Sequence, residues 1–268
     1  MLTRYYGSAG GHAAFVADVF ERAAPSYDRA CTVMSLGSGR RYRRQALQRA
    51  GLGPGARLLD LGTGTGLVAR AALEVVGGSG HVVGLDPSRA MLGQARRTLA
   101  APLVEGRAEA LPFAEATFDL VSMGYALRHV ADLGLVFREC RRVLRPGGTL
   151  VILEVTRPDS AAGRLLMRAY LQALLPLVMR VAPRGAEIGL MTRYYWETID
   201  RCVPPGVILD LLRRSGFAEV ARHVRAGWFS EYVGVTPRRR GSADREVPGV
   251  DVAHAVAAQE PEEPPAVP

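Results

Sequence analysis

The stretch RLLDLGTGTGLVAR, residues 57–70, reads as a short apolar strand that runs into a glycine-rich turn and then into a helix. In open α/β sheets, a turn of this kind lies at the carboxyl end of its strand, where ligands bind. The three glycines allow backbone conformations that other residues avoid, and they let a ligand approach the main chain closely. The stretch therefore predicts an α/β fold with a ligand site above its first strand.

Strands and helices alternate from this stretch onward. The apolar patterns predict strands at residues 57–61, 81–85, 102–105, 118–123 and 149–155, with helices at 67–76, 88–99 and 133–144 between them. The Arg-Pro-Gly-Gly sequence at 145–148 is predicted to stop a helix and form a turn. Alternation at this pace implies right-handed crossovers and a doubly wound, mostly parallel sheet.

The last part of the predicted fold differs from this pattern. A helix from Pro204 to Ser215 precedes two predicted strands, 217–223 and 232–236, and the short connection between these strands can only join antiparallel neighbours. We therefore expect a Rossmann-like α/β fold with a seven-stranded sheet and an antiparallel last strand. N-terminal helices at 12–24 and 39–50 precede the sheet, and a helical insertion of about residues 160–200 forms a lid. Residues 1–236 form one domain in this interpretation, and the proline-rich, mixed-charge residues 237–268 form a disordered tail.

The composition limits the classes of function. The net charge is +8, yet all 34 basic residues are arginine, which reflects codon usage more than a nucleic-acid partner. The three cysteines are far apart in the sequence, so we expect neither a metal site nor a disulfide, and a cytoplasmic location. No run of about 18 apolar residues, the length that spans a membrane, is present; the closest approach, residues 165–181, is interrupted by Arg168, Pro176 and Arg180. No nucleic-acid partner is expected.

The spacing of the glycine turn favours one of two cofactors. A dinucleotide site has the pattern G-x-G-x-x-G, whereas Gly62, Gly64 and Gly66 form G-x-G-x-G. Asp60, at the end of the strand, suits an ammonium group better than a pyrophosphate. S-adenosylmethionine carries an ammonium, a carboxylate that Thr65 and neighbouring amides can bind, and no phosphate. The turn therefore favours S-adenosylmethionine.

Two further anchors follow the second and third strands. Asp86 ends the second strand, where its carboxylate can accept both ribose hydroxyls of either cofactor. After the third strand, the sequence RAEALPF at 107–113 predicts a turn against the adenine, which the Ala108 amide can contact. Asp86 does not discriminate between the two cofactors, so the order of the motifs must decide.

Four motifs occur in an order that resembles a known family. DLGTGTG at 60–66, LDPS at 85–88, AEALPF at 108–113 and VLRPGGTL at 143–150 are similar to the signature of class I S-adenosylmethionine-dependent methyltransferases. The resemblance covers residues 27–236. It implies a methyltransferase that uses S-adenosylmethionine.

Three other segments narrow the resemblance. PSYD at 25–28 with MSLG at 34–37, GYALRHV at 124–130 and LEVTRP at 153–158 are similar to the ubiquinone/menaquinone biosynthesis C-methyltransferases. Members of that family methylate a ring carbon of a prenylated quinol. The resemblance implies a phenolic or quinol acceptor, with or without a prenyl chain, and it is compatible with a homodimer. The apolar residues 165–181 are predicted to form a buried lid helix; the alternative, which follows if the acceptor is prenylated, is a peripheral contact with the inner face of the membrane. An O- or N-methyltransferase of a small natural product is the alternative.

The same resemblance suggests two catalytic residues. The family has an Arg-Asn pair after the fourth strand, where this chain has Arg128 and His129. Arg128 is predicted to stabilise a phenolate, and His129 can act as a base near neutral pH. The chain departs from the family at Gly39, which replaces a histidine, and at the pair Cys31-Thr32, which replaces Asn-Asp.

The predicted donor site contains residues from all four motifs and from the N-terminal segment. Arg107 replaces a family asparagine and Gly124 a family serine, and both are retained as contacts of the donor. The predicted donor-binding residues are Tyr27, Asp60, Gly62, Thr63, Gly64, Thr65, Gly66, Asp86, Pro87, Arg107, Ala108, Glu109 and Gly124.

Overall fold

The computed structural model describes residues 20–21, 24–25, 27–158, 160–175, 177, 198–199 and 202–238. Residues 12–19 and 22–23 of the predicted helix at 12–24, most of the second half of the lid and the tail beyond residue 238 lie outside these residues. The division into a domain of residues 1–236 and a tail stays a prediction.

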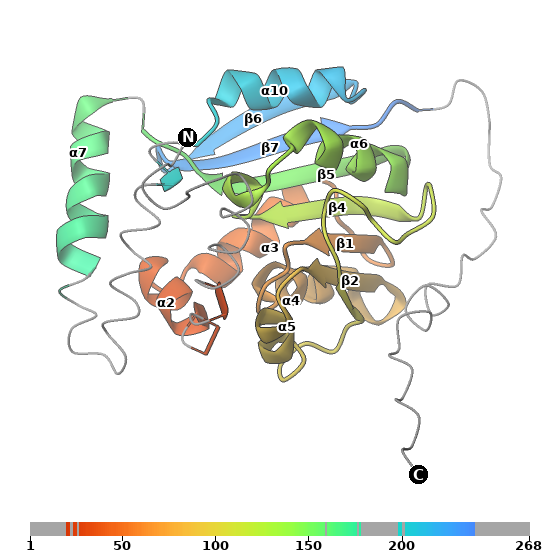
Figure 1. Ribbon diagram of the computed structural model, residues 1–268, viewed down its shortest axis with the longest axis horizontal. Helices are drawn as coiled ribbons and strands as arrows, with labels where there is room; N and C mark the ends of the chain where they lie inside the picture. The colour runs from red at the N-terminus through yellow and green to blue at the C-terminus, as the bar shows by residue number, and fades with distance from the viewer. Residues whose placement is uncertain are drawn as a thin grey trace, which may run out of the picture.

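Seven strands form one sheet in the order β3-β2-β1-β4-β5-β7-β6 (Figure 1). The strands are β1 (Arg57–Leu61), β2 (His81–Asp86), β3 (Leu103–Glu105), β4 (Phe118–Gly124), β5 (Leu144–Val155), β6 (Glu219–Arg225) and β7 (Phe229–Val235). The first five are parallel, and β7 is antiparallel to both β5 and β6. The predicted fold class is confirmed.

The chain reverses its direction of winding between β1 and β4. From β1 the strands proceed outward through β2 to β3, and the chain then returns to place β4 on the other side of β1. Open α/β sheets bind ligands at the carboxyl ends of the strands at this switch point. The fold therefore places the glycine turn, which follows β1, at the expected ligand site.

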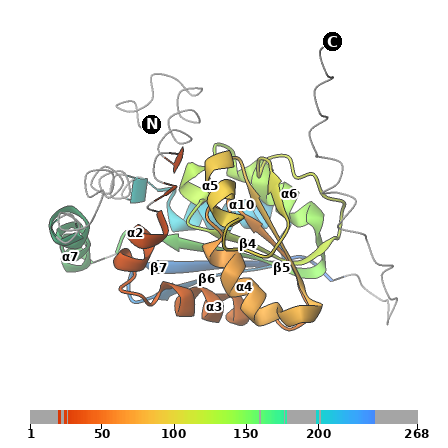
Figure 2. The ribbon, with the colours of Figure 1, turned by 90° about the horizontal axis from the view of Figure 1, so that it is seen from below.

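Helices cover both faces of the sheet (Figure 2). The helices before the lid are α2 (Tyr27–Met34), α3 (Gly39–Arg49), α4 (Leu67–Val76), α5 (Arg89–Ala95), the short η2 (Leu127–His129) and α6 (Leu133–Val143). The lid begins with α7 (Ala161–Ala169) and continues into the π-helical turn η3 (Tyr170–Leu174), and α10 (Pro205–Arg214) precedes β6. Alternate residues of β1 face the two cores: Leu58 packs with α3 and α4, and Leu59 packs with α6 and α10.

The fifth strand begins earlier than predicted. The sequence at 145–148 ends α6 as expected, but it belongs to β5 and not to a separate turn. The register with β4 jumps between the pairs Phe118–Leu144 and Leu120–Thr149, and Gly147 has a φ of +77°. The Pro-Gly-Gly segment is thus accommodated as an irregularity within the strand, which the local sequence signal of a turn did not reveal.

A third apolar cluster attaches the lid to the N-terminal helix. Met167, Leu171 and Leu175 lie one helical turn apart and pack against Ala30 and its neighbours on α2. The Tyr170 hydroxyl donates a hydrogen bond of 3.0 Å to the carbonyl of Met34. The lid helix therefore packs against α2, to one side of the main sheet (Figure 1). Within the described residues, no helix is both long and apolar enough to cross a membrane.

Candidate active site

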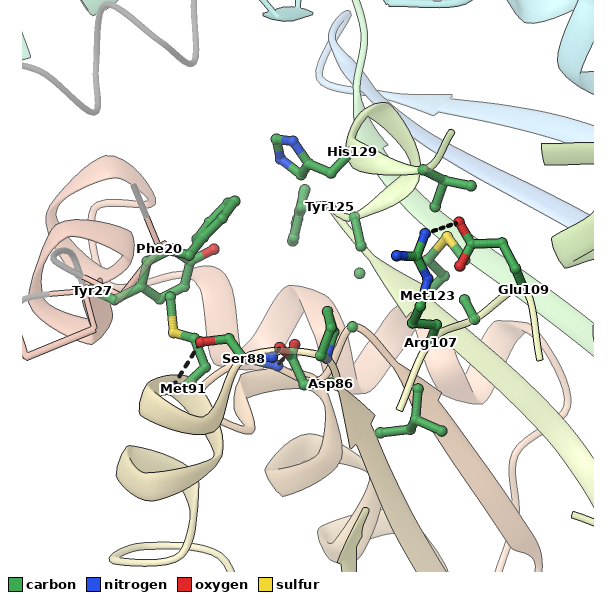
Figure 3. A pocket seen from close by; sticks show the side chains of 18 residues that line it. Phe20, Tyr27, Asp86, Ser88, Met91, Arg107, Glu109, Met123, Tyr125 and His129 are labelled. Atoms are coloured by element: carbon green, nitrogen blue, oxygen red, sulfur yellow. Dashed lines mark hydrogen bonds and ion pairs between the residues drawn. The ribbon is translucent and has the colours of Figure 1, made fainter. Parts of the chain in front are cut away.

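A cavity of about 320 Å³ opens at the carboxyl ends of β1, β2 and β4 (Figure 3). Its walls contain ten of the predicted site residues: Tyr27, Gly62, Gly64, Asp86, Pro87, Arg107, Ala108, Glu109, Gly124 and His129. Asp60, Thr63, Thr65, Gly66 and Arg128 do not line it. Segments that are distant in the sequence thus converge on one cavity, although five predicted residues lie behind its walls.

Asp60 holds the glycine turn from the interior of the protein. Its carboxylate is 1% exposed and accepts hydrogen bonds of 2.7 Å from the hydroxyls of Thr63 and Ser122. Burial raises the pKa of Asp60 to about 6, against the lowering effect of these hydrogen bonds. The carboxylate is therefore engaged within the protein, and its predicted contact with the donor ammonium stays a prediction.

Asp86 holds the same turn from the neighbouring strand. One carboxylate oxygen accepts the backbone N–H of Gly64 at 2.8 Å, and the other accepts that of Ser88 at 2.8 Å. Burial raises the pKa of this carboxyl, while the two amides lower it. Each carboxylate oxygen offers two lone pairs, so the group can also accept hydrogen bonds from the two hydroxyls of a ribose in the cavity.

Asp28 holds the turn from the N-terminal helix α2. Its carboxylate accepts a hydrogen bond of 2.5 Å from the Thr65 hydroxyl and pairs with Arg70 at 2.7 Å. Arg70 also donates to the carbonyl of Thr65. Because Asp28 follows Tyr27 directly, this contact fixes the segment that brings the Tyr27 side chain to the cavity.

The glycine turn leaves a space that a side chain would fill, and a cofactor can occupy this space. Gly62 and Gly64 have φ angles of +62° and +56°. A Cβ on Gly64 would meet no protein atom within 4 Å and would project into open space, and a Cβ on Gly62 would come within 2.8 Å of Ala126. A glycine-lined wall, a carboxylate that is able to accept ribose hydroxyls, and no cluster of cations among the described lining residues fit S-adenosylmethionine, which has no phosphate, better than a dinucleotide.

The turn after β3 forms a second wall of the cavity. Arg107 and Glu109 form an ion pair with 3.4 Å between nitrogen and oxygen, and Ala108 lies between them in the sequence. Figure 3 shows this pair on the far side of the cavity from Tyr27. The predicted adenine contact by the Ala108 amide is compatible with this position.

The two predicted catalytic residues lie in different surroundings. Both belong to η2, a single tight turn in which successive side chains point in different directions. His129 lines the cavity and makes an edge-to-face contact with Phe20, with 5.1 Å between ring centroids. Arg128 is 2% exposed and forms an ion pair with the buried Glu154 of β5. The predicted role of Arg128 in stabilising a phenolate stays a prediction, since its side chain does not line the cavity.

Sequence reasoning missed several residues of the cavity wall. Phe20 packs against Tyr27 with 6.1 Å between ring centroids. Tyr125 lies within the family-like segment 124–130 but was not singled out. The other unpredicted lining residues are Leu85, Ser88, Met91, Met123, Ala126 and Val130. Most of these residues directly follow or precede a motif residue. Their position next to the end of a strand is the signal that could have identified them.

Comparison with known proteins assigns the chain to a family. Residues 9–235 match the model of the ubiE/COQ5 methyltransferase family. The chain belongs to this family. It is an S-adenosylmethionine-dependent methyltransferase, so the predicted enzyme class and donor are confirmed.

The names of individual relatives are consistent with membership of the ubiE/COQ5 family. A demethylmenaquinone methyltransferase of Symbiobacterium thermophilum is 34% identical over 238 residues, which cover 85% of this chain and 94% of that protein. A 2-phytyl-1,4-naphtoquinone methyltransferase of Thermosynechococcus vestitus is 36% identical over 215 residues, covering 78% of this chain and 93% of that protein. The crystal structure of a SAM-dependent methyltransferase from Thermotoga maritima has a TM-score of 0.58 at 22% identity, covering 82% of this chain and 99% of that one, and shares the fold.

Replacing Asp86 tests the assignment of the donor site. We expect Asp86→Ala to weaken binding of S-adenosylhomocysteine at least about 100-fold. The variant loses the two charge-assisted hydrogen bonds that the carboxylate would accept from the ribose hydroxyls, and it leaves the backbone N–H of Gly64 without its acceptor. Isothermal titration calorimetry measures the affinity. The control is Glu105→Ala, which removes an exposed carboxylate at the end of β3 that pairs with Arg89. An unchanged affinity of a folded Asp86→Ala protein would remove Asp86 from the donor site.

Proposed function

We propose that this protein transfers the methyl group of S-adenosylmethionine to a ring carbon of a quinol, with a naphthoquinol as the preferred acceptor class. The relatives named above are methyltransferases of demethylmenaquinone and of 2-phytyl-1,4-naphtoquinone. The observation that carries the proposal is the position of His129, a potential base at an aromatic and apolar end of the donor cavity.

The cavity has two chemically different ends. Asp86, the glycine turn and the Arg107–Glu109 pair provide polar groups for the nucleoside and amino-acid parts of the donor. Phe20, Tyr27 and Val130 provide apolar surface near His129. An aromatic acceptor packs favourably against such rings in edge-to-face or offset arrangements. This division supports an acceptor ring that is held between the donor and His129.

The donor, when bound, supplies a methyl group on a positively charged sulfur. The bond between carbon and sulfur breaks and its electron pair stays with sulfur, so the acceptor needs only a nucleophilic carbon. Holding the reacting atoms in line can supply roughly 7–11 kcal/mol of the barrier. A neutral phenol ring is a weak carbon nucleophile, and loss of its hydroxyl proton makes the carbon beside it enolate-like. His129 is proposed to accept that proton. After methyl transfer the ring carbon bears both a hydrogen and the methyl group; this hydrogen then leaves as a proton to solvent, and the oxygen regains a proton from His129, which restores the aromatic quinol.

Arg128 is proposed to position this base. Its side chain is fully enclosed against Glu154, so the ion pair anchors η2 to β5. Breaking a buried pair by removing one partner is strongly destabilising. Through this anchor, Arg128 fixes the direction of the adjacent His129 side chain toward the cavity.

The product of the reaction tests the proposal directly. The donor with a ¹³C-labelled methyl group is incubated with the protein and a short-chain 2-prenyl-1,4-naphthoquinone, reduced to its quinol. We expect the ¹³C chemical shift of the labelled methyl group to be that of a methyl bonded to a ring carbon and not that of a methyl ether. A methyl ether in place of the ring methyl would favour the O-methyltransferase alternative, and absence of labelled product with this quinol would contradict the proposal.

A second test concerns His129 itself. We expect His129→Ala to lower kcat by about 10²- to 10⁴-fold, the usual contribution of a general base, with donor affinity within about twofold of the parent protein. Steady-state kinetics and calorimetry measure the two quantities. The matched control is His81→Ala, at the exposed amino end of β2, on the opposite edge of the sheet. A parental kcat for His129→Ala would make the histidine a bystander.

We further propose that the outer face of the lid contacts the membrane in which a prenylated acceptor resides. Leu165, Leu166, Leu174 and Leu177 are 52–70% exposed, whereas Met167, Leu171 and Leu175 of the same segment are buried against α2. Amphipathic helices with apolar residues and arginine bind at membrane surfaces, and the net charge of +8 favours anionic lipids.

Vesicle flotation tests this contact. The double variant Leu165→Gln/Leu166→Gln is expected to lose most of its co-flotation with vesicles that contain anionic phospholipid, because two inserted side chains are removed. The control variant Val207→Gln/Val224→Gln replaces apolar residues of similar exposure elsewhere and is expected to float as the parent does. Equal flotation of both variants would contradict a contact through the lid.

A further inference from the structure

Tyr125 has an unusual backbone conformation at the cavity wall. It follows β4 directly and has a φ of +61°, in the left-handed region that aromatic residues rarely adopt. Its N–H donates a hydrogen bond of 2.7 Å to the carbonyl of Leu153, which fixes this conformation. Such backbone outliers cluster at functional sites, where the surrounding structure maintains them. Figure 3 shows Tyr125 beside His129.

A buried cation lies behind the Tyr125 ring. The guanidinium carbon of Arg43, on α3, is 5.5 Å from the ring centroid, and the Arg43 residue is only 7% exposed. No carboxylate pairs with Arg43 in the part of the chain that the structure describes, and its Nε has no hydrogen-bond partner there. A buried charge without a counterion is costly, so its presence calls for a role other than stability.

Gly39 creates the space for this cation. A Cβ at position 39 would lie 2.7 Å from Nη1 of Arg43, closer than any contact distance allows. Gly39 therefore permits the observed position of Arg43.

The charges around Tyr125 sum to a positive value. Arg43 and Arg128 carry positive charge, Glu154 is the one carboxylate among the described groups that act on the phenol, and Cys31 is a partly exposed free thiol. Burial raises the pKa of Tyr125 to about 12, Arg43 lowers it and Glu154 raises it. The phenol therefore keeps its proton at neutral pH, and the neighbouring cation strengthens it as a hydrogen-bond donor.

The hydroxyl of Tyr125 makes no hydrogen bond to the described residues, although the residue lines the cavity. Resting on the proposed function, we propose that Tyr125 binds the acceptor by donating a hydrogen bond to the quinol oxygen beside the methylated carbon, with Arg43 as its positioning residue. Negative charge develops on that oxygen when its proton leaves. A donor aimed at a developing oxyanion, backed by a cation, stabilises this charge.

Tyr125→Phe is the direct test, since it removes only the hydroxyl. We expect kcat with the reduced short-chain 2-prenyl-1,4-naphthoquinone to fall by about 100-fold, with S-adenosylhomocysteine affinity within about twofold of the parent. Tyr232→Phe is the matched control, because Tyr232 also has an arginine, Arg222, over its ring and does not line the cavity; it is expected to keep the parental kcat.

Arg43 is tested by two variants of different charge. Arg43→Met keeps the stem and removes the charge, and we expect kcat to fall by about tenfold. Arg43→Lys keeps a cation and is expected to recover part of the loss. Equal kcat for the two variants would show that the charge has no role.

Inhibitor discrimination separates a contact with oxygen from a structural role. The probes are 2-methyl-3-prenyl-1,4-naphthoquinol and the hydrocarbon 2-methyl-3-prenylnaphthalene. We expect the parent to prefer the quinol by about 10- to 100-fold and Tyr125→Phe to lose most of that preference, while a change in packing would weaken both probes equally. Undiminished preference or parental kcat in Tyr125→Phe overturns the assignment of Tyr125. A parent protein that does not methylate the quinol overturns the proposed function, and this inference with it.

Discussion

Three aspartates hold three consecutive residues of the glycine turn, and the cavity depends on this arrangement. Asp60 from β1 binds Thr63, Asp86 from β2 binds Gly64, and Asp28 from α2 binds Thr65. The glycines of the turn adopt positive φ angles. A glycine-rich segment without such contacts could adopt many other backbone conformations. Contacts from three different elements restrict the turn to one conformation, so that the donor does not have to order it.

The same contacts connect the parts of the molecule that build the cavity. Asp28 links the turn to α2, and α2 carries the apolar cluster that supports the lid. Asp86 links the turn to the end of β2, where α5 begins with Ser88 as its N-cap. The turn is therefore the point at which the sheet, the N-terminal helices and the lid meet.

The sequence predicts the seven strands and the mostly parallel sheet, and ten of the fifteen predicted site residues line the cavity. Motif residues at strand ends, such as Asp86 and Gly62, lie where they do because the carboxyl ends of parallel strands share one edge of the sheet. Side-chain direction was harder to predict. Arg128 and His129 are adjacent, yet a tight turn sends one into the interior and the other to the cavity.

Two other features needed tertiary information. Asp60 looks like a ligand residue in the sequence, but its burial between β1 and β4 directs its carboxylate to Thr63 and Ser122. Arg43 belongs to a helix that reads as a basic surface helix, and only the packing of α3 shows that its charge is enclosed behind Tyr125. Local patterns report periodicity and spacing, whereas these positions depend on which elements pack together.

The most direct test of the account is a calorimetric comparison of two ligands on the parent protein. The account predicts that S-adenosylhomocysteine binds with a stoichiometry of about one per chain, as one cavity of this kind requires, and that NADH does not compete with it. Saturable binding of NADH together with no binding of S-adenosylhomocysteine would contradict the assignment of the cavity, and with it the roles given to every residue around the turn.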